Sequence, residues 1–144
     1  MAERTATTKW DGDLAHGSGV LNGASGALAD LEVTWASRTQ RSDGKTSPEE
    51  LIAAAHSSCF SMALANELTQ GGSAPERLEV SAKVTLDQRD GAPTVTTSEL
   101  TVTGRVPGID QSAFEQAAEN AGANCPISRA LAGVNITVNA TLTS

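Results

Sequence analysis

The chain has few cysteines, few basic residues and no long apolar run. Two cysteines in 144 residues are too few for the disulfide framework of a small secreted domain. No stretch approaches about 18 uninterrupted apolar residues, so no transmembrane helix is predicted. The first residues also lack the apolar core of a signal peptide. These absences together predict a cytoplasmic protein whose thiols stay reduced.

Positive charge is scarce as well. The chain has 10 Lys and Arg against 17 Asp and Glu, for a net charge of −7. Nucleic-acid binding requires clustered Lys and Arg, and an anionic membrane surface repels an acidic chain. We therefore expect neither nucleic acid nor a membrane as a partner. The length predicts one domain over residues 1–144, and the low aromatic content, 3%, favours a partner subunit that completes an alanine-rich core.

The clearest local pattern is a long helix over residues 48–70. Ser47 is a favourable N-cap, Pro48 fits the first helical position and Glu50 completes a capping box. Gly71 and Gly72 end the helix. The apolar stripe of this helix is predicted from spacings of three and four residues and contains Leu51, Ala55, Cys59, Met62 and Ala63. Cys59 is therefore expected to face packed surface.

Strand patterns flank this helix on both sides. Residues 5–35 read as short strands broken by glycine turns, followed by a polar loop over residues 39–46. Residues 78–86 alternate between apolar and polar, and Asp90-Gly91 predicts a hairpin turn. In the return strand the apolar residues change from odd-numbered to even-numbered positions, which predicts a bulge near Thr97–Ser98.

The C-terminal third predicts helix and then strand. Asp110 caps a helix over residues 111–121 that Gly122 ends, and Cys125-Pro126 opens a short helical turn. Residues 134–142 alternate as a closing strand. The order of elements predicts an α+β fold with an antiparallel sheet.

Cys59 and Cys125 are the candidate reactive groups. A thiol reacts as the thiolate, and burial of Cys59 in an apolar stripe raises its pKa. Cys59 lies too deep in its helix to benefit from the N-terminal dipole, so a reactive Cys59 requires a nearby cation. His56, Arg38 and Arg41 are the candidates by sequence, and Arg stays charged in any environment.

Two motifs resemble one family. The run Thr-Ser-Pro-Glu-Glu-Leu-Ile-Ala-Ala-Ala-His-Ser-Ser-Cys-Phe-Ser-Met-Ala-Leu (46–64) resembles the first cysteine helix of the OsmC/Ohr family, the osmotically inducible protein C and organic hydroperoxide resistance proteins. The run Asn-Cys-Pro-Ile-Ser-Arg-Ala-Leu (124–131) resembles its second cysteine motif. The order of elements also matches over nearly the whole chain, and the first motif points to the OsmC branch.

The resemblance implies a thiol-dependent peroxidase that reduces organic hydroperoxides and is reset by a dithiol, with lipoyl groups as the class of reductant. By resemblance, Cys59 is the peroxidatic and Cys125 the resolving cysteine, and the two form a disulfide. Glu49 matches the active-site Glu and Arg38 best matches the active-site Arg, with Arg41 as the alternative. The family fold is an antiparallel sheet wrapped around a long central cysteine-bearing helix in an intertwined homodimer. No metal or cofactor motif is visible.

The spacing of Glu49 and Cys59 constrains this interpretation. Ten residues of straight helix span about 15 Å, so a shared site requires Glu49 from the partner protomer or a bent helix. Two other function classes stay open. One is a redox sensor in which the disulfide is a switch, and the other is a Cys–His hydrolase that uses Cys59 and His56, although no orienting Asn or Asp is visible.

Overall fold

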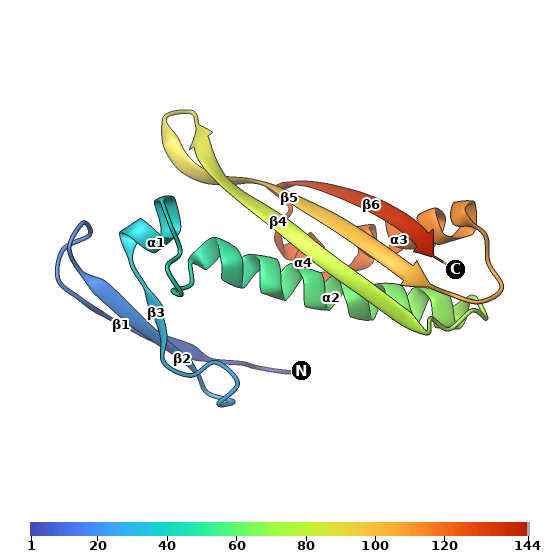
Figure 1. The fold of residues 1–144 in the computed structure, drawn as a ribbon, viewed down its shortest axis with the longest axis horizontal. Coiled ribbons are helices and arrows are strands. Elements are labelled where there is room, and N and C mark those ends of the chain that lie inside the picture. The colour runs from blue at the N-terminus through green and yellow to red at the C-terminus, as the bar shows by residue number, and fades with distance from the viewer. Residues whose placement is uncertain (144) are drawn as a thin grey trace. The chain divides into compact units, whose positions relative to one another are not determined.

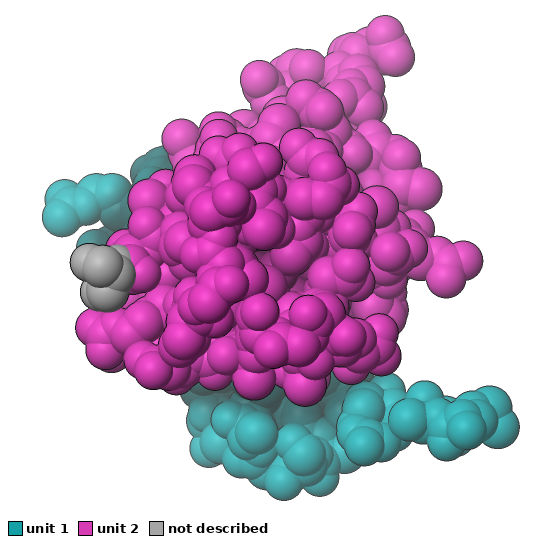
Figure 2. All heavy atoms as spheres, turned by 90° about the vertical axis from the view of Figure 1, so that its right-hand side faces the viewer, with its two compact units in different colours: residues 1–51 teal, residues 52–144 magenta. Residues whose placement is uncertain are grey.

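The computed structural model describes residues 1–143 and has the expected α+β fold (Figure 1). The chain forms two compact units, residues 1–51 and residues 52–144 (Figure 2). Helix α2 (Pro48–Gln70) begins in the first unit and continues in the second. Within residues 1–143, no helix is both long and apolar enough to cross a membrane.

Unit 1 is a small antiparallel sheet followed by a short helix. The strands β1 (Ala6–Asp11), β2 (Ser18–Gly23) and β3 (Leu31–Val33) pair in that order. Helix α1 (Trp35–Thr39) follows them, where the sequence predicted the end of a strand and the start of a polar loop. A capping box explains this helix, because the side chains of Thr34 and Ser37 each accept a hydrogen bond from the other's backbone N–H.

Unit 2 contains the second sheet and the remaining helices. Its elements are β4 (Arg77–Arg89), β5 (Ala92–Arg105), α3 (Gln111–Asn124), α4 (Pro126–Ala130) and β6 (Asn135–Thr143). Strands β4 and β5 are antiparallel, as the sequence predicted. Strand β6 pairs with β5 in parallel orientation, so this sheet is mixed and the prediction of a wholly antiparallel sheet fails at β6.

The hairpin between β4 and β5 is confirmed. Asp90 and Gly91 both have positive φ, 53° and 78°, as a two-residue hairpin turn requires. The predicted bulge is present close to its expected place. Thr85 pairs with Thr97 and Leu86 with Val95, which leaves Thr96 as the extra residue of β5.

Helix α2 begins and ends as predicted. Ser47 Oγ accepts a hydrogen bond from the Glu50 backbone N–H at 3.1 Å. The Glu50 side chain does not close a capping box on Ser47, because its carboxylate accepts the Thr46 hydroxyl instead, at 2.7 Å.

The predicted apolar stripe of α2 is wrong by one residue. Ala55 is exposed, and Met62 is 70% exposed. The stripe buried in unit 2 follows a spacing of four residues instead and consists of His56, Phe60, Leu64 and Leu68. Cys59 lies at its edge, half-buried and packed against the core.

Helix α3 continues through Gly122, which the sequence analysis predicted as its end. A Cβ at Gly122 would lie 3.0 Å from Val138 Cγ2. The glycine therefore allows the close approach of α3 to β6, and the helix ends at Asn124. Asp110 caps the start of α3 as expected, accepting the Ala113 N–H at 2.8 Å. The core of unit 2 joins α2, β5 and α3 around Phe60, Leu100 and Phe114.

Candidate active site

The two cysteines meet inside unit 2. Cys59 lies on α2, and Cys125 is the residue that ends α3 and precedes α4. Both are free thiols in the same core cluster, and each affects the pKa of the other, as does the Ile127 N–H. Cys125 is fully buried, whereas Cys59 is half-buried. The fold therefore brings two sulfurs from distant parts of the chain into contact.

The surroundings shift the two thiol pKa values in opposite directions. Burial raises the pKa of Cys59, the hydrogen bond with Cys125 raises it further, and the Ile127 N–H opposes both. Burial also acts to raise the pKa of Cys125, but hydrogen bonds from Cys59, from the N–H and hydroxyl of Ser128 and from the Ile127 N–H together hold it below its ordinary value.

His56 does not serve Cys59. Its ring is fully buried, with Nδ1 at 2.6 Å from Ser98 Oγ and Nε2 at 2.8 Å from Ser128 Oγ. Burial lowers its pKa, so the imidazole is neutral at pH 7. A neutral ring supplies no cation to Cys59. Both of its nitrogens are engaged by serines, so neither is available as the base that the Cys–His hydrolase hypothesis requires.

Ser98 and Ser128 were not identified from the sequence, although each had a signal. Ser98 is buried on the same face of β5 as Leu100 and Val102. A buried hydroxyl at such a position needs a hydrogen-bond partner. Ser128 lies three residues after Cys125, inside the second cysteine motif.

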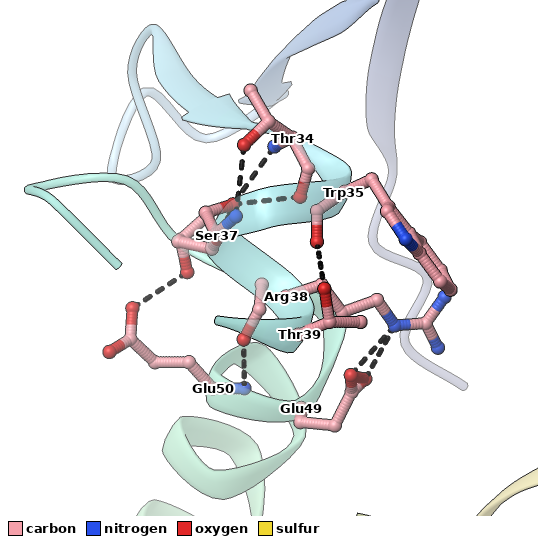
Figure 3. A network of polar contacts seen from close by, with 9 residues as sticks. Thr34, Trp35, Ser37, Arg38, Thr39, Glu49 and Glu50 are labelled. Atoms are coloured by element: carbon pink, nitrogen blue, oxygen red, sulfur yellow. Dashed lines mark hydrogen bonds and ion pairs between the residues drawn. The ribbon is translucent and has the colours of Figure 1, made fainter. Parts of the chain in front are cut away.

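Arg38 and Glu49 form an ion pair in unit 1 (Figure 3). Arg38 Nε lies 2.7 Å from Glu49 Oε1 and 3.3 Å from Oε2. Glu49 is buried, at 7% exposure. This contact is not a fork of two parallel bonds, because Nε alone contacts the carboxylate. The terminal NH₂ groups of the guanidinium take no part in this contact.

The loop between α1 and α2 is fixed by hydrogen bonds that align this pair. Ser37 Oγ donates to the Thr46 carbonyl at 2.9 Å, and the Thr46 N–H donates to the Glu32 carbonyl at 2.9 Å. Arg41, the alternative to Arg38, lies 3.9 Å from Asp43 with 89% of its side chain exposed. The geometry of unit 1 therefore favours Arg38.

A mostly apolar pocket of about 270 Å³ lies beside Arg38 within unit 1. Its walls include Trp10, Trp35, Leu51 and the side chain of Arg38. Such a pocket accommodates a small apolar group next to a cation. No cluster of three metal-ligating side chains occurs within residues 1–143.

Comparison with known proteins identifies the family. The family model described as OsmC-like protein matches residues 41–139. The chain belongs to the OsmC-like family. It is 39% identical over 122 residues to "Peroxiredoxin OsmC" of Escherichia coli K12, covering 85% of each chain. The OsmC-like proteins of Escherichia coli and Shigella flexneri are equally similar to this chain.

Solved structures show the same fold. The organic hydroperoxide resistance protein OhrB of Bacillus subtilis has a TM-score of 0.76 at 24% identity, over 95% of this chain and 98% of that chain. An OsmC-like protein from Mycoplasma pneumoniae has a TM-score of 0.74 at 13% identity, over 99% of both chains. The OsmC-like fold therefore persists where little sequence identity remains.

Proposed function

We propose that this OsmC-like protein is a thiol-dependent peroxidase that reduces organic hydroperoxides to alcohols. The observation that carries the proposal is the proximity of Cys59 and Cys125, two free thiols brought together from α2 and from the junction of α3 and α4. The names of the relatives, peroxiredoxin and organic hydroperoxide resistance protein, agree with this chemistry.

In the first step the Cys59 thiolate attacks the terminal oxygen of the hydroperoxide. The O–O bond breaks, the alkoxide leaves and takes a proton to become the alcohol, and Cys59 is oxidised to a sulfenic acid. Burial and Cys125 both disfavour the Cys59 thiolate, so this step requires a cation. Arg38 supplies it in this proposal, through the terminal N–H groups that the Glu49 contact leaves available.

In the second step Cys125 resolves the sulfenic acid. Its thiolate attacks the Cys59 sulfur, the S–O bond breaks, and the hydroxide leaves and takes a proton to become water. The product is a Cys59–Cys125 disulfide. A dithiol then reduces the disulfide by thiol exchange and is itself oxidised.

The apolar pocket beside Arg38 favours an organic substrate over hydrogen peroxide. Each CH₂ group buried in such a pocket contributes about 0.8 kcal/mol. Leu51 of α2 is one of the apolar side chains that line this pocket.

We further propose that the working site belongs to a homodimer. Glu49 and Cys59 are separated by about 15 Å of helix, so the Arg38–Glu49 pair of one protomer is placed beside the thiols of its partner. Helix α2 also presents an exposed face of small side chains together with Met62, which is 70% exposed. Small residues permit two helices to approach closely.

Peroxide consumption with purified protein tests the function. Wild-type protein with dihydrolipoamide should consume cumene hydroperoxide catalytically and hydrogen peroxide more slowly, with thioredoxin as the comparison reductant. Cys59→Ser should abolish consumption. Cys125→Ser should release one equivalent of alcohol and then stop.

Two results would contradict the proposal. If both cysteine variants lost the first turnover equally, Cys59 would not be the peroxidatic cysteine and Cys125 would not be the resolving one. Oxidation that forms the disulfide once, with no turnover on any dithiol, would instead support the redox-sensor hypothesis.

A further inference from the structure

A buried polar network joins the resolving cysteine to His56. His56 on α2, Ser98 on β5 and Ser128 on α4 meet in the otherwise apolar core of unit 2, and each is less than a tenth exposed. Ser128 lies three residues after Cys125 at the start of α4, and its hydroxyl and backbone N–H both lower the pKa of Cys125. The proposed reaction leaves His56 and both serines without a role.

The available donors and acceptors determine which way these hydrogen bonds run. Ser98 is fully buried, and His56 Nδ1 is the one side-chain or backbone partner of its hydroxyl among residues 1–143. If Nδ1 carried the proton, the Ser98 hydroxyl proton would have no acceptor, at a cost of about 1–3 kcal/mol. Ser98 therefore donates to Nδ1, and the single N–H of the neutral ring is on Nε2.

This tautomer orients Ser128. The His56 Nε2–H donates to Ser128 Oγ at 2.8 Å, which directs the hydroxyl proton of Ser128 away from the ring. That proton is then free to point toward Cys125, whose pKa the Ser128 hydroxyl lowers. A hydroxyl held in this way stabilises a thiolate without placing a cation in the core.

We propose that His56 and Ser128 are positioning residues for the resolving step, in which His56 orients the Ser128 hydroxyl so that it holds Cys125 as the attacking thiolate. This inference rests on the proposed peroxidase function. The pair acts on the formation of the S–S bond, when the Cys125 lone pair displaces hydroxide from the Cys59 sulfenic acid. It does not act on the attack of Cys59 on the peroxide. The groups that face Cys125 are Cys59 from α2 and, from α4, Ser128 and the Ile127 amide, while Arg129 of α4 is exposed.

The test separates the two chemical steps. Protein is mixed with one equivalent of cumene hydroperoxide, alcohol release reports the first step, and rapid-quench mass spectrometry reports disulfide formation. Ser128→Ala should leave alcohol release within about twofold of wild type and slow disulfide formation about tenfold at pH 7, corresponding to one pKa unit. The rate of disulfide formation should recover at higher pH, because the pH at half-maximal rate moves upward.

Three further variants complete the experiment. Ser128→Thr keeps the hydroxyl and should restore the wild-type pH profile. His56→Gln retains one donor and one acceptor and should fall between wild type and Ser128→Ala. Ser61→Ala is the matched control, because the Ser61 hydroxyl donates to the Ser57 carbonyl of its own helix at 2.7 Å.

The outcomes are distinct. Disulfide formation in Ser128→Ala at the wild-type rate and pH profile would overturn the inference. A slowing of both steps together, unrelieved by higher pH, would also overturn it by showing a purely structural role. Absence of alcohol release from the wild type would instead refute the peroxidase function itself.

Discussion

At the scale of single residues, the two thiols carry an apparent contradiction. The cysteine assigned to attack the peroxide has a raised pKa, and the cysteine assigned to resolve has a lowered one. The contradiction disappears if the activating cation comes from Arg38 and if Cys125 is prepared for the second step by its own hydrogen bonds. Each thiol is then activated by a different set of groups.

Removal of the Arg38 charge should therefore raise the apparent pKa of Cys59. In a Cys125→Ser background, where a single thiol is observed, Arg38→Ala should shift the midpoint of iodoacetamide alkylation upward by about one to three pH units, the range for loss of an opposite charge. Arg41→Ala in the same background is the matched control and should not shift it. An unchanged midpoint in the Arg38 variant would remove this arginine from the site.

His56 should make stability depend on pH. Its folded-state pKa lies below the ordinary value of 6.5, so the unfolded chain binds the proton first. The free energy of unfolding is therefore highest above pH 6.5. It decreases by up to about 1.4 kcal/mol per pH unit as the pH falls toward the folded-state pKa. Urea unfolding at fixed protein concentration measures this slope.

The chain supplies a control for this measurement. His56→Gln should remove the part of the slope that His56 contributes. His16→Gln should retain it, because the His16 side chain is 86% exposed. Equal slopes in the two variants would show that the buried ring does not resist protonation.

At the scale of elements, the sequence predicted what local chemistry determines. The bounds of α2 follow from Ser47, Pro48 and the glycine pair, and the Asp90-Gly91 turn follows from its need for positive φ. The thiol contact came from a family resemblance, since spacing along the chain says nothing of distance in space. The serines around His56 were missed because their partners lie 42 and 72 residues away.

The errors share a physical cause. Gly122 was interpreted as a helix end, but tertiary packing against Val138 explains it. The predicted buried stripe of α2 was wrong because the many alanines give the helix no clear apolar side. Two different faces of the helix therefore fit the pattern expected of a buried one. Which face of a helix is buried, and whether a glycine ends the helix, depends on the neighbouring strand or helix. The local sequence does not contain that information.

Gly104 is a second glycine whose role is packing. A Cβ there would lie 2.5 Å from Phe114 Cζ and 3.1 Å from Leu78 Cδ2, and the Phe114 ring is fully buried. Gly104→Ala should therefore lower the free energy of unfolding by about 1–3 kcal/mol, the usual cost of overpacking. Gly133→Ala is the control, since nothing lies within 4 Å of its added Cβ. Urea midpoints that are equal for the two variants would contradict this account of β5 and α3.

At the scale of the whole molecule, unit 1 has too small a core for its apolar content. Leu21 is its one buried hydrophobic side chain, while Trp10, Leu14, Val20 and Leu28 are between 37% and 59% exposed. A three-stranded sheet needs an apolar face buried against another element. A second copy of the chain is the partner that the proposed function already requires.

Mixed dimers provide the decisive test of this arrangement. If Arg38 of one protomer serves Cys59 of the other, Arg38→Ala and Cys59→Ser chains are each inactive alone but form one intact site when paired. Refolding equal amounts together should restore roughly a quarter of wild-type activity, because half of the dimers are mixed and one of their two sites is complete.

The reciprocal mixture gives the opposite expectation. Wild-type chains refolded with an equal amount of the Arg38→Ala, Cys59→Ser double variant should retain about a quarter of the activity of an all-wild-type sample, since both sites of a mixed dimer then lack one group. If the site lies within one protomer, this mixture retains about half and the complementing pair stays inactive. Peroxide consumption at one total protein concentration distinguishes the two patterns. Because mixed and pure dimers share the same fold, the difference reports only which protomer brings the guanidinium to the thiol.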